Sequence, residues 1–470
     1  MKLNKIDKDI YEMPCEGEMK VPVKIFANEK ILSDMEKDKT LQQIKNVSHL
    51  PGILVAAMLM PDGHQGYGFP IGGVAGFDLA EGVITPAGIG YDVNCSVRLL
   101  KTNLLKRDIL KKQKEVIEAI YRKIPSGLGR GSSFQISRKK FYEVLKGGAQ
   151  YLVKEGYGKK ADYMHTEELG CLCDADPSYV SEEAIKRGIG QLGTLGSGNH
   201  FLEVGYVEKI FDEKIAEVFG LKEDLVTIMI HCGSRGLGHQ IISDYIDEMK
   251  KQYKKENFPD PELVYAPIKS SLGKSCLSAM ACATNFAFAN KQLITYWLRE
   301  ELSGIYPEIE IDVVYDVCHN IAKFEEHKIN GKMKTVLVHR KGATRSFGPG
   351  RIEIPSKYRK VGQPVIIPGS MGTSSYVLVG TKKSEELTFG STVHGAGRVK
   401  SRHQAMSTFS SSKVVKELSE KGIEVRSRDK NAIAEEAPGA YKDVEDVVEV
   451  VHELGLSKKI AKLKPLAVLK

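Results

Sequence analysis

The apolar stretch Val226-Thr-Ile-Met-Ile230 runs directly into His231-Cys-Gly-Ser-Arg-Gly236. Its length and its β-branched residues predict a buried strand that ends in a glycine-containing turn. A second such stretch, Asp312-Val-Val-Tyr-Asp-Val317, reaches His319-Asn320 after one further residue. A polar side chain at the end of a buried strand, followed by a loop, is a common place for chemistry in proteins that combine strands and helices.

Further strands are predicted over 53–59, 335–339, 364–367 and 376–379, and helices over 105–123, 277–302 and 440–456. The apolar faces expected for the first and third helices are Leu105, Ile109, Leu110, Val116, Ile117 and Ile120, and Val444, Val447, Val448 and Val451. Helices and strands intermix throughout, so the fold class is α/β in the broad sense of a mixed α+β protein. One large domain over residues 1–470 is expected, because the residues that suggest chemistry lie between positions 62 and 470 and must converge.

Composition is that of a folded protein. The 470 residues are 42% hydrophobic and 27% charged, with a net charge of +8, which suits a polyanionic partner without requiring one. No apolar run approaches the roughly 18 residues that span a bilayer, and the first residues lack a signal peptide's apolar core, so a cytoplasmic protein is expected. The eight cysteines include no C-x-x-C pair, which excludes a zinc ribbon and a thioredoxin-like motif.

Glycine is concentrated at a few places. Nine glycines lie between Gly63 and Gly90, and shorter clusters follow at 193–198, 233–238, 348–350, 369–372 and 395–397. Such clusters supply turns and allow the backbone to approach a ligand closely.

Several residues are of types that bind metals. Asp92 and Cys95 are three residues apart, so a carboxylate and a thiolate could face one ion; taken alone, the pair is more typical of a turn aspartate and a core cysteine. Gly196-Ser-Gly-Asn199-His200-Phe-Leu-Glu203 places three polar side chains within five positions after small residues, which favours a functional segment. With His231 and His319, this set favours a binuclear centre of manganese, zinc, iron or cobalt over magnesium, and ligand chemistry alone would give zinc first.

Other segments suggest phosphate chemistry. His394 in Thr392-Val-His394-Gly-Ala-Gly-Arg398 is open to a bulky electrophile, although a simple loop histidine is equally compatible with the residues. Glycines and hydroxyls in Pro368-Gly-Ser-Met-Gly-Thr-Ser-Ser375 could hold phosphate, but no P-loop motif is present. Basic runs at 339–345 and 398–402 are either solvated faces or phosphate contacts. Base stacking as the main binding mode is not supported, because aromatic and basic residues do not alternate in any run.

Taken in order, these segments resemble the RtcB RNA ligase family. The resemblance is carried by Met60-Pro-Asp-Gly-His-Gln-Gly66, Gly90-Tyr-Asp-Val-Asn-Cys95, Gly198-Asn-His-Phe-Leu-Glu203, His231-Cys-Gly-Ser-Arg-Gly236, His319-Asn320 and His394-Gly-Ala-Gly397, and it extends to the final Lys470. It implies a single domain around a deep cleft that holds metal. Five residues then look like the ligands of two Mn²⁺ ions, with the cysteine bridging: Asp92, Cys95, His200, His231 and His319.

The resemblance also implies that His394 is the nucleophile that takes GMP from GTP. The guanylate site it implies consists of Asn199, His200, Phe201, Leu202, Glu203, His319, Asn320, Pro368, Gly369, Ser370, Met371, Ser375, Gly395, Ala396, Gly397 and Lys470. RNA phosphates are expected at Arg235, Arg345, Arg398 and Arg402.

The implied reaction joins a 2′,3′-cyclic phosphate or 3′-phosphate RNA end to a 5′-hydroxyl end through an activated RNA-3′-pp-5′-G end. RNA, in the form of tRNA halves or other cleaved RNA, and an archease-type activating protein are the expected partners, and a monomer is the default. The principal alternative is a metal-dependent phosphoesterase or nuclease that acts on RNA ends without guanylylation. A non-catalytic RNA-binding protein would leave the many metal-binding side chains without a use.

Overall fold

The computed structural model describes residues 2–127, 129 and 131–470, and its strands form two large sheets. The seven strands of the first sheet are, in spatial order, β1 (Asn4–Asp7), β2 (Ile10–Met13), β3 (Val23–Phe26), β4 (Ile53–Tyr67), β5 (Phe69–Asp78), β13 (Lys332–Lys341) and β12 (Asn320–Ile329). Those of the second are β11 (Ile311–Cys318), β7 (Ser96–Leu105), β9 (Leu225–Cys232), β8 (Phe201–Ile210), β19 (Ser457–Leu469), β16 (Ser375–Gly380) and β15 (Pro364–Ile367), with β18 (Glu424–Arg426) paired to β19.

Two short ladders and the helices complete the structure. The ladders join β6 (Val83–Ile84) to β10 (Ala266–Pro267) and β14 (Ala343–Arg345) to β17 (Ser391–Val393). The helices are α1 (Glu29–Met35), α2 (Thr40–Val47), α3 (Lys106–Lys123), α4 (Arg138–Lys154), α5 (Lys160–Met164), α6 (Glu182–Ile189), α7 (Glu213–Phe219), α8 (Arg235–Gln252), α9 (Ser271–Ile305), α10 (Lys382–Thr388), α11 (Arg402–Thr408), α12 (Ser411–Glu420), α13 (Lys430–Glu435) and α14 (Val444–Glu453). The 3₁₀ turns are Pro86–Gly88, Glu167–Gly170, Pro177–Tyr179 and Pro438–Ala440.

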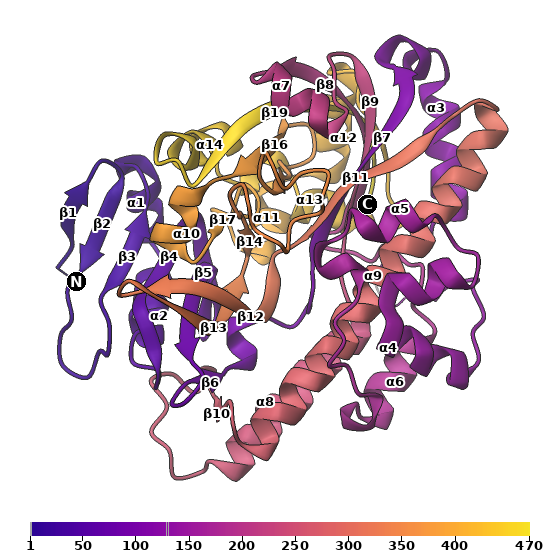
Figure 1. Ribbon diagram of the computed structural model, residues 1–470. Helices are drawn as coiled ribbons and strands as arrows, with labels where there is room; N and C mark the ends of the chain where they lie inside the picture. The colour runs from indigo at the N-terminus through magenta and orange to yellow at the C-terminus, as the bar shows by residue number, and fades with distance from the viewer. Residues whose placement is uncertain (1, 128, 130) are drawn as a thin grey trace.

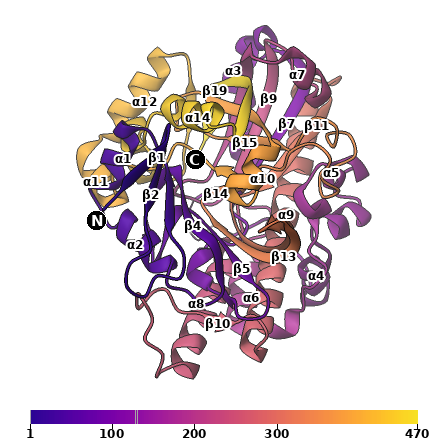
Figure 2. The ribbon, with the colours of Figure 1, turned by 60° about the vertical axis from the view of Figure 1, so that its left-hand side comes forward.

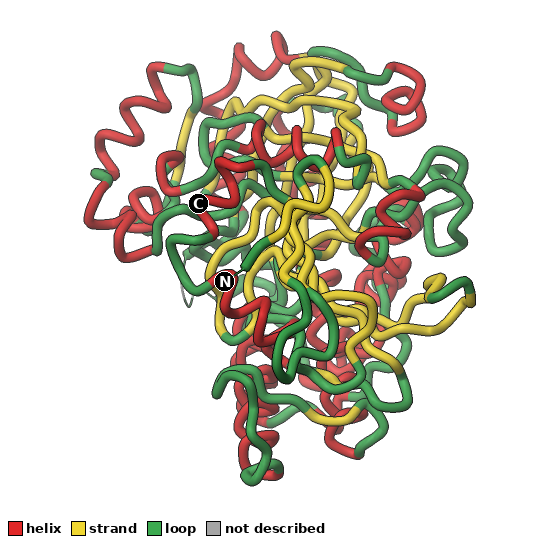
Figure 3. The backbone as a smooth tube through the Cα atoms, turned by 90° about the vertical axis from the view of Figure 1, so that its left-hand side faces the viewer, coloured by secondary structure: helices red, strands yellow, loops and turns green. Residues whose placement is uncertain are grey.

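Most strands lie in the middle of the molecule, and the first three lie at one side. Figure 1 shows β1–β3 with α1 and α2 on one side and helices α4, α6, α8 and α9 on the other, and Figure 3 shows the strands gathered between the helices. Lys470 lies inside the body, with only 4% of its surface exposed (Figure 2). No helix in the described part of the chain combines the length and the apolar character that crossing a bilayer requires.

The predicted mixture of helices and strands is confirmed, but the strand direction is not that of a parallel α/β sheet. Among the pairings of named strands in the described residues, only β3–β4 and β18–β19 are parallel. Neighbouring strands of the second sheet therefore present alternately their beginnings and their ends at each edge. This alternation determines where the polar side chains meet.

All six predicted strands are present, and most extend beyond the predicted bounds. β9 and β11 are buried on both faces and end at Cys232 and Cys318, next to the two histidines that marked them. In the glycine-rich segment after residue 60, β4 continues to Tyr67, and the turn that the glycines suggested lies at Gly68, with φ of +64°.

The predicted helices are also present. α9 is 35 residues long and begins at the N-cap Ser270, whose side chain accepts from the backbone N–H of Gly273. α14 is shorter than predicted, but its valine stripe is buried as expected. Two residues of the face predicted for α3 differ from the expectation: Leu105 is the last residue of β7, and Leu110 is 49% exposed.

Candidate metal centre and nucleotide cavity

One edge of the second sheet brings the predicted metal ligands together. Cys95 and His200 immediately precede β7 and β8, whereas His231 lies at the end of β9 and His319 directly follows β11. The spatial order β11-β7-β9-β8 is antiparallel throughout, so the beginnings of two strands meet the ends of the other two at this edge. The register pairs Phe201 with His231. Residues far apart in sequence thus become neighbours through strand pairing alone.

The ligand atoms form two triads that share one sulfur. Cys95, His231 and His319 make the first triad, and Asp92, Cys95 and His200 make the second; within each, the ligand atoms lie within 4.8 Å of one another. Cys95 Sγ is 3.2 Å from His231 Nε2 and 3.4 Å from His200 Nε2. His231 Nε2 is 3.4 Å from His319 Nε2. The Cys95 sulfur is therefore the one candidate ligand atom that the two triads have in common.

The local backbone fixes Asp92 in this position. Gly90 and Asn94 on either side have positive φ angles of +87° and +49°. The carbonyl of Asp92 accepts from Asn320 Nδ2 at 3.1 Å, which ties the loop to the start of β12. A Cβ atom at Gly233 would lie 2.4 Å from the Asp92 carboxylate, so only glycine leaves room for this carboxylate to reach His200 Nε2 at 2.7 Å.

His200 is oriented by a chain of contacts from α9. Its Nδ1 donates to the carbonyl of Leu195 at 3.0 Å, which leaves Nε2 facing Cys95 and Asp92. The loop that carries Leu195 is held by Asn290 of α9, whose side chain accepts from Gly193 and Thr194 and donates to Thr194. An outer carbonyl of this kind is the usual partner of a metal-binding imidazole.

The backbone next to His319 is held by the buried carboxylate of Glu167. Glu167 accepts from the backbone N–H of Cys318 at 2.8 Å and forms an ion pair with Lys323 of β12. The two residues after Glu167, Glu168 and Leu169, both have φ near +50°, a backbone conformation that is strained for residues other than glycine. The turn that carries His319 is therefore fixed from outside the sheet.

The donor set fits a pair of borderline divalent cations. Burial lowers the pKa values of His231 and His319 well below the ordinary range, so both rings are neutral and carry lone pairs. Burial, and after it the charge of Asp92, raises the pKa of the Cys95 thiol to about 12. Without a cation these lone pairs would face one another with few donors among them, whereas a divalent ion would stabilise the thiolate and accept the lone pairs.

His394 lies directly beside this centre. Its ring centroid is 4.9 Å from that of His319. Its Nδ1 is 2.5 Å from a carboxylate oxygen of Asp62, and the same oxygen accepts from the backbone N–H groups of His394 and Gly395 at 2.8 and 3.3 Å. Asp62 is completely buried, so the Nδ1 proton is fixed and the Nε2 lone pair is left available.

A cavity of about 1290 Å³ opens onto His394 and His231. This volume exceeds the roughly 300–1,000 Å³ of a typical small-molecule site. Its walls come from the ends of β4 and β9, the loops after β15 and β17, α11 and the carboxyl terminus. The lining includes Arg398, Lys400, Arg402, Lys442 and Lys470, a basic set that suits a polyanion.

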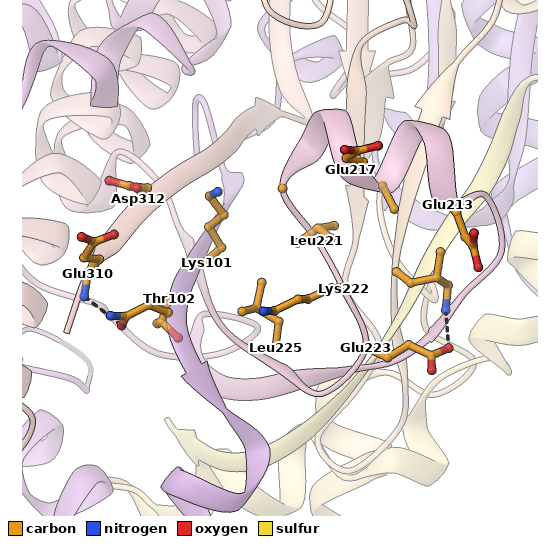
Figure 4. Close-up of a pocket in the computed structure, with 14 residues that line it drawn as sticks. Lys101, Thr102, Glu213, Glu217, Leu221, Lys222, Glu223, Leu225, Glu310 and Asp312 are labelled. Atoms are coloured by element: carbon orange, nitrogen blue, oxygen red, sulfur yellow. Dashed lines mark hydrogen bonds between the residues drawn. The ribbon is translucent and has the colours of Figure 1, made fainter. Parts of the chain in front are cut away.

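A second hollow, of about 760 Å³, lies at the opposite end of the same sheet (Figure 4). Lys101 and Asp312 face it from β7 and β11, and Glu217 and Leu221 from α7 and the loop that follows. Its lining includes no histidine and no cysteine. The first cavity, with His394 and the two triads, is therefore the candidate active site.

Comparison with known proteins decides the family. A family model described as tRNA-splicing ligase RtcB matches residues 43–470. The chain belongs to the RtcB family. It is 49% identical to tRNA-splicing ligase RtcB of Thermococcus kodakarensis, over 100% of this chain and 98% of that protein. The protein of the same name from Methanococcus maripaludis is 49% identical over 100% and 99% of the two chains. RNA-splicing ligase RtcB homolog 1 of Entamoeba dispar is 46% identical over 95% and 86%.

Membership of the RtcB family confirms the predicted enzyme class, an RNA ligase. Most of the residues expected to contact guanylate line the cavity: Asn199, Phe201, Pro368, Gly369, Ser370, Met371, Gly395, Ala396, Gly397 and Lys470. Lys470 donates from Nζ to the carbonyl of Gly198 at 3.1 Å and lies 3.8 Å from Glu436. The carboxyl-terminal residue thus reaches the same cavity as His394.

Other residues expected there do not line the cavity. Leu202 and Glu203 are buried in β8, and burial raises the pKa of Glu203 to about 8. Ser375 accepts from the backbone N–H of Gly369 at 3.0 Å, so it shapes the loop. Asn320 bridges Asp92 and Gly342, and His200 and His319 belong to the metal triads.

The four arginines expected to bind RNA phosphate have different surroundings. Arg398 and Arg402 line the cavity, and Arg402 is 60% exposed. Arg235 is half-buried against Thr194 and His200. Arg345 does not fit the expectation: it is 1% exposed and its guanidinium binds Glu168 and Gln363 at 2.7 and 3.0 Å. Acidic residues from a distant segment neutralise it, which the basic run alone does not reveal.

Three residues at the site had no assigned role in the sequence. Asp62 lies within a quoted motif, but nothing in Pro61-Asp62-Gly63 distinguishes it from a turn aspartate. Glu436 and Tyr441 line the cavity and contact the half-buried Arg398, whose Nη1 is 3.0 Å from each. A buried carboxylate that neutralises this arginine has no local sequence signal, because its partner is 38 residues away.

Proposed function

We propose that this enzyme is a GTP- and Mn²⁺-dependent RNA ligase that works through a His394–GMP adduct. It joins an RNA 2′,3′-cyclic phosphate or 3′-phosphate end to a 5′-hydroxyl end. The observation that carries the proposal is the pairing of His394 Nδ1 with the buried Asp62, at the wall of a large basic cavity and beside two triads of metal-binding side chains.

Asp92, Cys95, His200, His231 and His319 would hold two Mn²⁺ ions, with Cys95 bridging. When bound, such ions offset negative charge on phosphoryl oxygens and align the attacking and leaving atoms. Ligand chemistry alone fits several borderline metals, and manganese is chosen through the family resemblance.

His394 is suited to attack phosphorus through Nε2. The Asp62 carboxylate holds the proton on Nδ1 and stabilises the positive charge that develops on the ring as the new bond forms. Nε2 attacks the α-phosphorus of GTP, a phosphorus–nitrogen bond forms, the bond from the α-phosphorus to the bridging oxygen breaks, and pyrophosphate leaves. The side chain of His394 is 14% exposed, so the imidazole remains accessible from the cavity.

The later steps use the same histidine as the leaving group. Water opens a cyclic phosphate to a 3′-phosphate. An oxygen of that phosphate attacks the GMP phosphorus and releases His394, which gives the activated RNA-3′-pp-5′-G end. The 5′-hydroxyl oxygen then attacks the RNA 3′-phosphorus, GMP leaves, and a 3′,5′ phosphodiester remains. A phosphate monoester is a poor electrophile until it carries such a leaving group.

The names of the relatives support a proposal for the substrate. Relatives named tRNA-splicing ligase support spliced tRNA halves as the RNA, with repair of other cleaved RNA as the broader role. Arg235, Arg398 and Arg402 would contact its phosphates. We further propose one ligase domain over residues 1–470, a cytoplasmic monomer and assistance by an archease-type protein.

The test is incubation of the purified protein with GTP radiolabelled in the α-phosphate and Mn²⁺, followed by peptide mapping. The wild type should acquire one GMP on the peptide that contains His394. His394→Ala should retain its metal but acquire no label, whereas His403→Ala, which changes another histidine on the cavity wall, should still be labelled. An unlabelled wild type that still removes RNA cyclic phosphates would instead indicate a metal-dependent phosphoesterase, and label on the His394→Ala variant would contradict the assigned nucleophile.

A further inference from the structure

We propose that Tyr67, Tyr91 and His239 form an aromatic platform on which a nucleobase of the RNA stacks beside the reacting ends. The inference rests on the proposed function, because it assigns three residues of the cavity wall that the guanylate site does not use. It names a nucleobase as the ligand and these three rings as the residues that hold it.

The rings come from three distant segments and touch one another. The Tyr91 and His239 rings are stacked, with centroids 4.8 Å apart and planes inclined by 26°. Tyr67 meets Tyr91 edge to face, with centroids 5.9 Å apart. All three residues line the large cavity. Their dispersal over the last residue of β4, the loop before β7 and the first turns of α8 explains why the linear sequence contains no stacking motif.

The platform adjoins the candidate metal centre and is made of residues that the guanylate site does not use. Tyr91 directly precedes the metal ligand Asp92 in the chain. Lys470, Arg402 and Tyr441 also line the cavity, and they contact Gly198, Glu435 and Glu436 rather than the three rings. A cavity of about 1290 Å³ has room for more than one nucleotide. A second nucleotide would therefore meet these rings.

The backbone that carries Tyr67 is fixed by hydrogen bonds, whereas its ring and that of His239 are exposed. Lys341 is buried and donates from Nζ to the carbonyls of Tyr67 and Phe69 at 3.0 and 2.7 Å, which fixes the hairpin tip. Tyr67 nevertheless exposes 63% of its surface, and His239 is also exposed. A lone exposed aromatic side chain needs no explanation, but two exposed rings that converge with the half-buried Tyr91 on one cavity mark a binding surface.

A nucleobase is the ligand that this arrangement fits best. Every base offers a π-face, so stacking on tyrosine or histidine binds RNA without demanding a particular sequence. The cationic side chains of the same cavity can hold the attached phosphate. The strand that supplies the base is either the 3′-phosphate strand or the 5′-hydroxyl strand, since both must approach the centre.

The experiment uses short RNA oligonucleotides with 2-aminopurine as the terminal base, in Mn²⁺ without GTP, so that no ligation occurs. One oligonucleotide carries the label at a 3′-phosphate end and another at a 5′-hydroxyl end. Binding should quench the fluorescence of one of them, which identifies the strand. The dissociation constant of that strand should rise roughly 5- to 150-fold in His239→Ala and in Tyr91→Leu, as expected for loss of a base–aromatic stack.

Three controls make the result specific. Tyr91→Phe should bind as the wild type does, because the ring is retained. Tyr179→Leu, at an exposed tyrosine away from the cavity, should have no effect. An oligonucleotide whose terminal nucleotide lacks a base should bind the wild type and His239→Ala equally well. Metal content and thermal unfolding show that each variant is folded.

Unchanged fluorescence with both strands would overturn the platform, as would quenching that persists in both His239→Ala and Tyr91→Leu. Failure of the proposed function has a different signature, which is the absence of labelled His394 in the wild type incubated with GTP. Because the stacking assay contains no GTP, the two outcomes are independent.

Discussion

Asp62→Asn should slow guanylylation of His394 while leaving the metal centre intact. One oxygen of Asp62 accepts three hydrogen bonds, from Nδ1 and the backbone N–H of His394 and from the backbone N–H of Gly395. Asparagine can keep an acceptor at this place, but it removes the negative charge that stabilises the ring during attack. It also buries an amide group where the second oxygen of Asp62 has no partner among the described residues.

The magnitude follows from the charge. A hydrogen bond to a charged group contributes about 1.5–3 kcal/mol, so its loss in the transition state corresponds to a roughly 10- to 150-fold lower rate of adduct formation. The rate is measured by quenching a single-turnover reaction with labelled GTP and Mn²⁺. Asp34→Asn, which changes another carboxylate on the cavity wall, is the matched control and should react at the wild-type rate. Wild-type speed in Asp62→Asn, or loss of its metal, would refute the assigned role.

Three further predictions concern metal, pH and salt. Cys95→Ala should lose metal and ligation together because both triads share its sulfur, whereas Cys276→Ala in α9 should keep both; full metal content in the first variant, by elemental analysis, would reject the bridge. Burial opposes ionisation of Asp162, but its two-pronged contact with Arg299 prevails and lowers the carboxyl pKa from 3.8 to about 2. The resulting stabilisation, about 2 kcal/mol, is present above pH 4 and lost as the pH falls towards 2, so urea midpoints of the wild type and Asp162→Asn should converge below pH 4. Arg402→Ala should reduce the salt dependence of RNA binding by a slope of about 0.7, and an unchanged slope would remove this residue from the phosphate contacts.

Much of the fold could be predicted because strands such as 226–230 and 312–317 are rich in β-branched residues, and helix 277–302 is too long and too apolar for another interpretation. Sheet order could not be predicted in the same way, because pairing between β7, β9 and β11 depends on contacts between segments more than 80 residues apart. The adjacency of Cys95 and His231 is a product of that order.

Individual roles depended on whether a side chain's partner is local. His231 and His319 could be singled out because each follows a buried strand. Arg345 was misjudged since its neutralising partners, Glu167 and Glu168, come from a segment about 180 residues earlier in the chain. Asp62 was not assigned for the same reason, because its partner His394 is 332 residues away.

Two strand beginnings and two strand ends meet at the candidate metal centre, and this arrangement has a consequence for how the protein folds. Ligands at positions 95 and 319 come together only after distant strands have paired, and such pairing is slow because chain entropy is lost before contacts compensate for it. A cation bound there would link residues that are far apart in the chain, and its binding free energy would add to the free energy of unfolding. Stripped of metal, the molecule should open first at this edge and exchange its amide hydrogens there, while the Lys101 end of the same sheet stays protected.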